Sequence, residues 1–234
     1  MKIDFETKCY ENDWKHVLLT DKIFKLLDNC SFQFNERILY INNVNNYELV
    51  INEANKLINK KIIDKYIIVK DYSENALNFF DININSFNGG YIYSISELVS
   101  IYLSNADYLL HFSSDSNLDN KYNWINDAIN IMNNNLNIIV ANPCWSHDFS
   151  RAKSESIYED SLFYYSYGLS DQCYLIKLSE FKNKIYGEYN MFSERYPIHG
   201  GNSFEKRVDS YMRNKNKLRI TSKNSFYTHK NIIE

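Results

Sequence analysis

The sequence predicts an α/β fold, in which a mostly parallel central sheet is flanked by helices. Between residues 37 and 143, short apolar segments alternate with segments whose apolar residues recur at helical spacing. Strands that alternate with helices are typical of βαβ units with parallel strands. Because their crossovers are right-handed, the carboxyl ends of the strands meet at one edge of the sheet. A chain of 234 residues is long enough to bury the core of one such domain.

Four segments have the length and the polar boundaries of buried strands. "RILYINNV" (37–44) ends in asparagine and is expected to be the first strand, because residues 1–36 are mixed in pattern. "KYIIVKDYSEN" (65–75) is expected to be a second strand that ends at Asp71. "DYLLHFSSD" stops abruptly in small polar residues around Asp115, and "NIIVANP" (137–143) is closed by Pro143.

Helices are predicted between and around these strands from apolar residues on one stripe. They are expected in "WKHVLLTDKIFKLLDN" with Asp21 as its cap, in "NNYELVINEANKLINKKII", in residues 89–106, in "NWINDAINIMNNN", and from about Ser203 onward. Residues 147–171 show no clean period and are expected to be a loop. Residues 172–181 read as a strand entering a helix or turn, and "LRITSKNSFYTHK" as a short strand or hairpin with a tail.

Composition excludes several classes of protein. The formal net charge of −3 gives no basic field of the kind that nucleic-acid binding needs. The first residues lack the apolar stretch of a signal peptide, and no run of about 18 apolar residues predicts a transmembrane helix. The four cysteines are scattered without a CxxC pair, which disfavours a zinc site. We therefore expect a cytoplasmic protein with reduced thiols.

Four polar residues occupy positions where a ligand site would form. Asp71 and Asp115 end predicted strands, Glu205 lies in the first turn of a late helix after a Gly-rich loop, and His229 lies near the carboxyl end. Ligands of open parallel sheets bind at the carboxyl ends of the strands. Each residue also has a simpler role open to it: turn former, helix cap, first-turn acid or tail residue.

The order of these segments resembles that of GT-A-fold glycosyltransferases, most closely family 2. "RILYINNVNNYELV" resembles the first strand of that family with its Asn-containing turn, and "YIIVKDYSEN" resembles its second strand. "GGYIYSISELVSIYLSNADYLLHFSSDSN" resembles its glycine, helix and strand ending in Asp-x-Asp. "NSFEKRVDSYMRNKNKLRITSKNSFYTHK" resembles its Glu-Asp helix, later basic residues and final histidine. The resemblance covers about half of the chain, and it rests on the shared order of these motifs.

This resemblance implies a single GT-A-like, Rossmann-type domain over residues 1–234. About 37–118 would bind a nucleotide-sugar donor, and about 119–234 would face a glycan or other hydroxyl acceptor. It implies inverting sugar transfer with Glu205 as the base, and a weakly held Mn²⁺ or Mg²⁺ on Asp115 and His229. The donor-binding residues that it implies are Asn42, Asn43, Asp71, Gly90, Ser113, Ser114 and Asp115.

Three positions depart from the family pattern. Ser113-Ser114-Asp115 stands in place of Asp-x-Asp, Lys70-Asp71 in place of Asp-Asp, and Glu205-Lys206 in place of Glu-Asp. A catalytically degenerate nucleotide-sugar-binding module is therefore an alternative function. A sugar nucleotidyltransferase is less favoured, because "NNVNNYE" (42–48), at the end of the first predicted strand, has neither the glycine nor the lysine of a phosphate loop.

Overall fold

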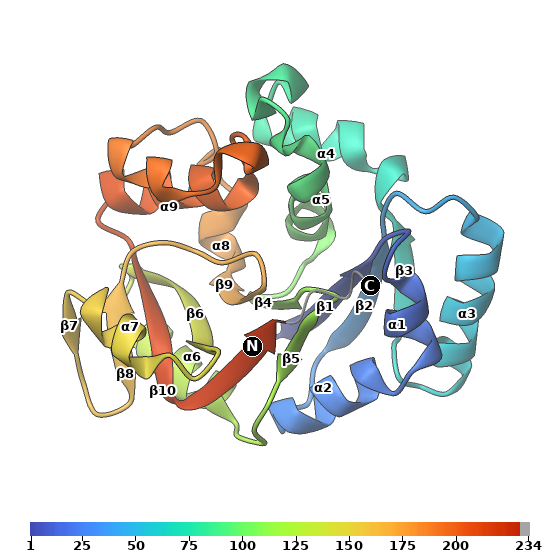
Figure 1. Ribbon diagram of the computed structural model, residues 1–234, viewed down its shortest axis with the longest axis horizontal. Helices are drawn as coiled ribbons and strands as arrows, with labels where there is room; N and C mark the ends of the chain where they lie inside the picture. Colours follow the sequence, from blue (N-terminus) through green and yellow to red (C-terminus); the bar gives the residue numbers. More distant parts are fainter. Residues whose placement is uncertain (230–234) are drawn as a thin grey trace.

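The computed structural model describes residues 1–229, which form a ten-stranded sheet between two layers of helices (Figure 1). The strands are β1 (Ile3–Cys9), β2 (Glu36–Ile41), β3 (Lys65–Ile68), β4 (Tyr108–Phe112), β5 (Ser116–Leu118), β6 (Ile138–Trp145), β7 (Tyr158–Glu159), β8 (Phe163–Ser166), β9 (Cys173–Lys177) and β10 (Leu218–His229). Their order in the sheet is β3-β2-β1-β4-β9-β6-β10-β8-β7, and β5 pairs with β10.

The direction of the strands divides the sheet into two parts. The pairs that join β1 to β2, β2 to β3 and β1 to β4 are all parallel. Beyond β4 the sheet is mixed, because β9 runs antiparallel to both β4 and β6, and β8 runs antiparallel to β10. The predicted α/β class, with a mostly parallel sheet and a mixed carboxyl-terminal part, is confirmed.

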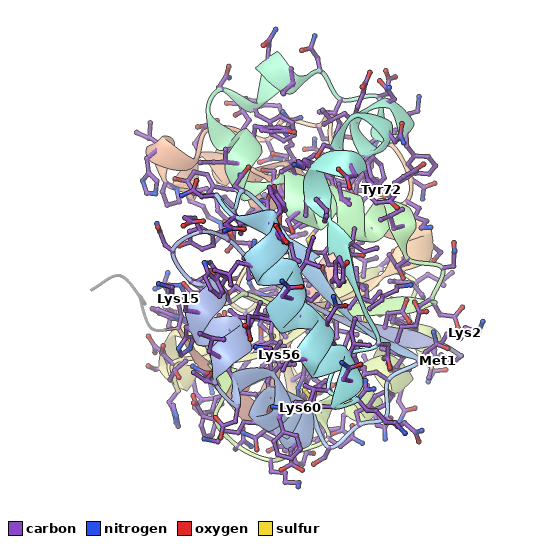
Figure 2. The ribbon with its side chains drawn as sticks, turned by 90° about the vertical axis from the view of Figure 1, so that its right-hand side faces the viewer. Met1, Lys2, Lys15, Lys56, Lys60 and Tyr72 are labelled. Carbon is purple, nitrogen blue, oxygen red and sulfur yellow. The ribbon has the colours of Figure 1, made fainter. Side chains whose placement is uncertain are left out.

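Helices cover both faces of the sheet (Figure 1). They are α1 (Trp14–Leu19), α2 (Lys22–Cys30), α3 (Tyr47–Asn59), α4 (Ser73–Phe80), α5 (Ile95–Leu103), α6 (Trp124–Asn134), α7 (Phe149–Ser154), α8 (Leu178–Phe181) and α9 (Phe204–Asn214). The short 3₁₀ helices are η1 (Val69–Asp71), η2 (Ile84–Phe87), η3 (Gly90–Tyr93), η4 (Met191–Arg195) and η5 (Ile198–Gly200). In Figure 2, α3 lies in front, and Lys56 and Lys60 on its outer side are exposed.

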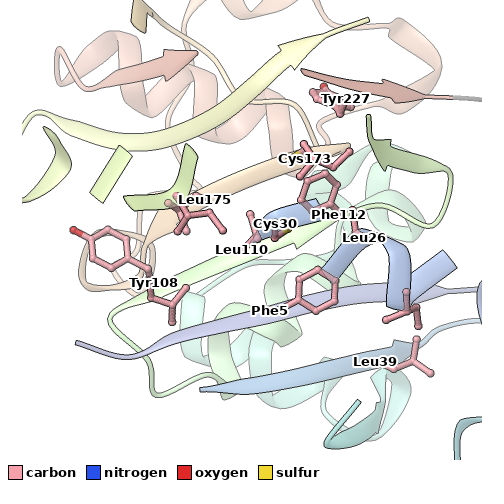
Figure 3. Packing of buried hydrophobic residues seen from close by; sticks show 14 of the residues in the cluster. Phe5, Leu26, Cys30, Leu39, Tyr108, Leu110, Phe112, Cys173, Leu175 and Tyr227 are labelled. Atoms are coloured by element: carbon pink, nitrogen blue, oxygen red, sulfur yellow. The ribbon is translucent and has the colours of Figure 1, made fainter. Parts of the chain in front are cut away.

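The two layers follow from the alternation of side chains along the strands. Leu39 of β2 and Leu110 of β4 belong to a cluster with α1, α2, α3 and α6, and Figure 3 shows them beside Leu26 of α2. Leu109 of β4 points to the opposite face, where it packs with α8 and α9. Each central strand is therefore buried on both sides.

The sequence analysis missed β1, so the strand predicted at 37–44 is the second strand and not the first. The reason is that β1 carries charged residues on a face that is nonetheless buried: Asp4 and Glu6 are 2% and 1% exposed. Asp4 accepts a hydrogen bond of 2.8 Å from Ser104, and Glu6 accepts one of 2.8 Å from Ser100. Buried carboxylates paired with serines give no apolar alternation from which a buried strand can be recognised.

Other boundaries also differ from the predictions. The helix expected before residue 30 is two helices, α1 and α2, which divide at Asp21. The strand from 65 ends at Ile68 and is followed by η1 and α4, and the helix expected over 89–106 is η3 followed by α5. β6 passes through Pro143, where pairing with β10 is interrupted between Asn142 and Cys144, so no ladder hydrogen bond is lost there. Residues 147–171 are not all loop, because they contain α7, β7 and β8.

The remaining elements lie where they were expected: α3, β4, α6, β9 with α8, and α9 with Ser203 as its N-cap. The expected final strand is β10, which at 12 residues reaches across the sheet to pair with β5, β6 and β8. Within residues 1–229, no helix combines the length and the apolar character needed to cross a membrane.

Candidate functional site

A cavity of about 690 Å³ lies at the carboxyl ends of β1, β2 and β4, and we call it the edge cavity. Its volume is in the range of small-molecule sites, and its position is the one expected for ligands of parallel sheets. Strand ends supply one part of the wall, and η3, η5 and the segment before β9 supply another. Its lining residues are Lys8, Cys9, Tyr10, Asn12, Asn42, Asn43, Ile92, Tyr93, Ser113, Ser114, Asp115, Asp171, Gln172, His199 and His229.

Six of the residues singled out in the sequence meet in the edge cavity: Asn42, Asn43, Ser113, Ser114, Asp115 and His229. Asn42 is buried, and its backbone N–H donates to the Cys9 carbonyl at 2.9 Å, which joins the ends of β2 and β1. Asn43 is exposed with a φ of 48°, a left-handed conformation that asparagine tolerates better than most residues. The turn after β2 therefore presents polar groups at the rim.

Asp115 is held through both of its carboxylate oxygens. Ser113 Oγ donates to Oδ1 at 2.7 Å, and His229 Nε2 lies 2.7 Å from Oδ2. The histidine reaches Asp115 because the end of β10 pairs antiparallel with β5, with His229 opposite Ser116. About a quarter of each of the two side chains is exposed, so this pair is ordered but accessible.

Buried charged groups lie next to Asp115. Lys22 Nζ donates to the Ser116 carbonyl at 2.8 Å and to Asn117 Oδ1 at 3.0 Å. Burial lowers the pKa of Lys22 to about 8, although Asp115 opposes this shift. Burial raises the pKa of Asp13 to about 6, against a hydrogen bond from Ser114. Such shifted groups around one carboxylate are typical of functional sites.

The pair of Asp115 and His229 fits a weakly held divalent cation better than a tightly held one. A carboxylate oxygen and an imidazole nitrogen are both accepted ligands of Mn²⁺, and both side chains line the cavity. In the part of the chain that the structure describes, no cluster of three or more His, Cys, Asp or Glu side chains could hold a metal ion. A cation here would need the rest of its ligands from a bound phosphate and water.

Asp71 and Gly90 do not line the edge cavity. Asp71 is exposed at the end of η1, after the edge strand β3, and its neighbour Tyr72 is labelled on the outer face of the molecule in Figure 2. Gly90 is buried between two loops, and a Cβ there would lie 2.3 Å from the Gly200 carbonyl oxygen. The glycine therefore serves the close approach of η3 to the 200–203 loop.

A second cavity, of about 390 Å³, adjoins the first across residues 170–172, and Gln172 lines both. We call it the arginine cavity, because Arg151, Arg195 and Arg219 line it. β6, α7 and β10, which lie side by side in Figure 1, contribute a large part of its wall. The sequence analysis did not predict this cavity.

Glu205 lies at the junction of the two cavities. It lines the arginine cavity, and its carboxylate accepts a hydrogen bond of 2.6 Å from the backbone N–H of Asp171, which lines the edge cavity. Burial, and then the neighbouring Asp171 carboxylate, raise the pKa of Glu205 well above its usual range. The charged form of Glu205 is therefore disfavoured at this junction.

The sequence analysis missed Lys8 and Asp171 as site residues. Lys8 was missed because it lies on β1, the strand that was not recognised. Its ammonium forms an ion pair with the buried Glu97 of α5. Asp171 comes just before β9, a strand that runs antiparallel to β4. The amino end of β9 therefore lies at the same edge as the carboxyl end of β4. The motif "SDQCYLIK" could have revealed Asp171 only if the direction of β9 had been known.

No protein-family model matches this sequence, and a search of curated proteins returns no match. Solved structures do match over nearly the whole chain. S. aureus TarS 1-349 in complex with UDP matches 97% of this chain with a TM-score of 0.53 and 12% identity. GalNAc-T7 with UDP, GalNAc and Mn²⁺ matches 98% with a TM-score of 0.60 and 10% identity, and a mycobacterial protein matches 98% with a TM-score of 0.52 and 12% identity.

These likenesses establish the fold. The chain has the fold of the GT-A glycosyltransferases, as the resemblance in its sequence predicted. The chain spans 60% of the matched TarS 1-349 structure, 44% of the GalNAc-T7 structure and 67% of the mycobacterial protein.

Proposed function

We propose that this chain is a glycosyltransferase that binds a nucleotide sugar in the edge cavity and transfers its sugar to a hydroxyl acceptor in the arginine cavity. The observation that carries the proposal is the junction of two cavities. One contains the Asp115–His229 pair, the other contains Glu205, and Asp171 lies between them. The fold adds weight, since the matched structures include TarS with UDP-GlcNAc and GalNAc-T7 with UDP and GalNAc.

The edge cavity offers the groups that a nucleotide sugar needs. Asn42, Asn43, Ser113 and Ser114 supply hydrogen-bonding groups at the rim and floor. Lys8 adds a cation. Burial alone would lower the pKa of this ammonium, but the ion pair with Glu97 outweighs burial and raises the pKa above its ordinary value. A donor diphosphate would lie between this ammonium and Asp115.

Asp115 and His229 would hold a divalent cation, Mn²⁺ or Mg²⁺, together with the diphosphate of the donor. When bound, this cation supplies positive charge that stabilises the departing nucleoside diphosphate. The side chains themselves position the phosphate end of the donor, and Ser113 fixes the rotamer of Asp115 through its hydrogen bond of 2.7 Å.

Transfer to a hydroxyl needs a group that accepts the proton of the attacking oxygen. The pair of Glu205 and Asp171 meets this need in position, because it borders both cavities. Burial, and then the neighbouring Asp171 carboxylate, raise the pKa of Glu205 and so favour its proton-holding form. In its ionised form Glu205 would accept the hydroxyl proton as the acceptor oxygen bonds to the sugar carbon and the bond from that carbon to the nucleoside diphosphate breaks. Attack on the face opposite this leaving group would give inversion at the sugar carbon.

A nucleotide-sugar-binding module without turnover is a second candidate. It is favoured by Ser113, a serine where family 2 has the first acid of Asp-x-Asp, and by the absence of a three-ligand metal cluster within residues 1–229. No observation favours a sugar nucleotidyltransferase.

The test is a panel of nucleotide sugars with UDP, GDP, CMP and dTDP leaving groups, each with Mn²⁺, with Mg²⁺ and with excess chelator. Thermal shift identifies the donor, since a ligand at 100 times its Kd adds about 2.7 kcal/mol of stability. Mass spectrometry then follows donor hydrolysis and transfer to sugar acceptors. Binding with cation-dependent hydrolysis supports the transferase. Binding without hydrolysis under any condition supports the binding module, and no binding of any nucleotide contradicts both.

A further inference from the structure

The arginine cavity contains a guanidinium group whose hydrogen bonds are incomplete. Arg219 of β10 is almost buried, with 11% of its side chain exposed. Its Nη2 donates to Ser166 Oγ at 2.8 Å, but its Nε is buried and has no hydrogen-bond partner among the residues that the structure describes. A buried N–H of a charged group is costly to leave unpaired, which points to a ligand that completes the set.

Two further arginines line the same cavity, from separate segments of the chain. Arg151 of α7 is exposed and lies with its guanidinium carbon 5.3 Å from the Trp145 ring centroid. Arg195 of η4 is more than a third exposed and lies 3.4 Å from Asp209, a carboxylate that Arg213 also binds at 2.8 Å. Three guanidinium groups therefore converge on about 390 Å³.

Three carboxylates also line this cavity, but none of them pairs with Arg219 Nε. Asp148 is already occupied, because it accepts from Ser150 Oγ at 2.8 Å and from the Arg151 backbone N–H at 2.9 Å. Glu155 is shared, at 3.1 Å from Arg151 Nε and 3.7 Å from Arg219 Nη2. Glu205 accepts from the Asp171 backbone N–H at 2.6 Å. The cavity thus presents the unpaired Nε of Arg219 and the exposed guanidinium of Arg151 near a flat apolar wall, Trp145, which is 40% exposed.

We propose that the arginine cavity is a subsite for an anionic acceptor, in which Arg219 with Arg151 and Arg195 binds a phosphate or carboxylate group and Trp145 packs against the uncharged part of the molecule. Guanidinium groups bind these planar or tetrahedral oxyanions through paired hydrogen bonds, so the shared chemistry is an oxyanion on a hydroxylated molecule. The role of this molecule as an acceptor rests on the proposed glycosyltransferase function, whereas binding of the anion does not depend on that function.

The experiment measures binding of three matched probes without nucleotide: glucose 6-phosphate, glucuronate and glucose. The readout is tryptophan fluorescence, because Trp145 is exposed while Trp14 and Trp124 are buried, and a Trp145→Phe variant assigns the signal. The fluorescence titrations should show that both anionic probes, or the one with the preferred oxyanion, bind at least tenfold more tightly than glucose. The tighter anion distinguishes phosphate from carboxylate.

Arg219→Gln should weaken the anionic probe by about tenfold or more, because a hydrogen bond to a charged group is lost. If Arg219→Gln does not fold, Arg151→Gln tests the same cavity, because Arg151 is exposed and its substitution should not affect folding. Arg37→Gln is the control, since Arg37 pairs with Asp64 in the amino-terminal part of the sheet and should leave binding unchanged. Equal binding of glucose and the anions, or unchanged binding in both cavity variants, overturns the proposal.

Failure of the proposed function gives a different result. If the edge cavity bound no nucleotide sugar while glucose 6-phosphate still changed the Trp145 signal in an Arg219-dependent way, the anion site would stand and the transferase would fall. If a donor were bound and hydrolysed while no anionic probe bound, the anionic acceptor would be wrong and the transferase would stand.

Discussion

The edge cavity and the arginine cavity share the segment 170–172 but present different charged groups. The edge cavity presents a carboxylate and a histidine, so on our proposal it would hold a phosphate group through a recruited cation. The arginine cavity presents guanidinium groups, so on our proposal it would hold an anion directly. The difference follows from their construction. The first is built largely from the ends of parallel strands, and the second from segments of the mixed carboxyl-terminal part.

The largest effect should come from breaking the edge cavity alone. Asp115→Asn removes the negative charge that would hold a cation and weakens the contact with His229, which is 2.7 Å long. Because a bound cation stabilises the leaving group by several kcal/mol, the transfer rate should fall by about 10³-fold or more. Steady-state rates with saturating Mn²⁺ measure this loss.

The matched control is Asp119→Asn, four residues further along the chain, where the exposed carboxylate only accepts from Thr228 Oγ1 at 3.0 Å. It should keep the wild-type rate. Binding of an anionic probe in the arginine cavity should be the same in both variants. Full activity of the wild-type protein in excess chelator would show that Lys8 and other cationic side chains carry the charge of the leaving group instead.

The junction of the two cavities should give the next largest effect. Glu205→Gln keeps an oxygen that can accept the 2.6 Å hydrogen bond from the Asp171 backbone but cannot accept a proton. We expect transfer to fall by about a hundredfold or more while donor affinity measured by calorimetry stays unchanged. Glu194→Gln is the control, because Glu194 is an exposed carboxylate that pairs only with Lys206 among the described side chains. If donor binding were lost as well, Glu205 would belong to the donor site or would be required for folding.

The same variant gives a readout of stability that is independent of activity. The pKa of Glu205 is raised in the folded protein, so the folded state holds a proton that the unfolded state releases above its ordinary pKa of 4.5. Wild-type stability is therefore favoured below that pH and decreases as the pH rises toward the folded pKa. Glu205→Gln lacks this decrease, so its stability relative to the wild type should rise with pH in urea titrations. An identical pH dependence in both proteins would contradict the assigned burial.

Much of the fold and part of the site could be predicted from the sequence. Asp115 was found because β4 is apolar on both faces and ends abruptly, and His229 because of its place in the order of segments. β1 could not be recognised because its buried acids Asp4 and Glu6 depend on partners distant in the sequence, including serines about 100 residues away. The arginine cavity depends on α7 and β8, in a segment without a regular period, and on the pairing of β8 with β10. Both failures concern contacts between residues that are distant in the sequence.

The smallest effect is expected at Asp71, whose assignment to the donor site depended on overlooking β1. With 37–44 taken as the first strand, Asp71 seemed to end the second strand and to face the donor; with β1 in place, Asp71 follows the edge strand β3 and is exposed outside the edge cavity. Asp71→Ala should therefore change donor affinity and transfer rate by less than about twofold, because exposed substitutions away from a site alter free energies by no more than about 0.5 kcal/mol. Asn42→Ala, at the end of β2 and inside the cavity, is the matched comparison and should weaken donor binding by about tenfold, since a hydrogen bond in a buried position is lost. If Asp71→Ala weakened the donor as much as Asn42→Ala, the bound nucleotide would extend beyond the edge cavity toward β3.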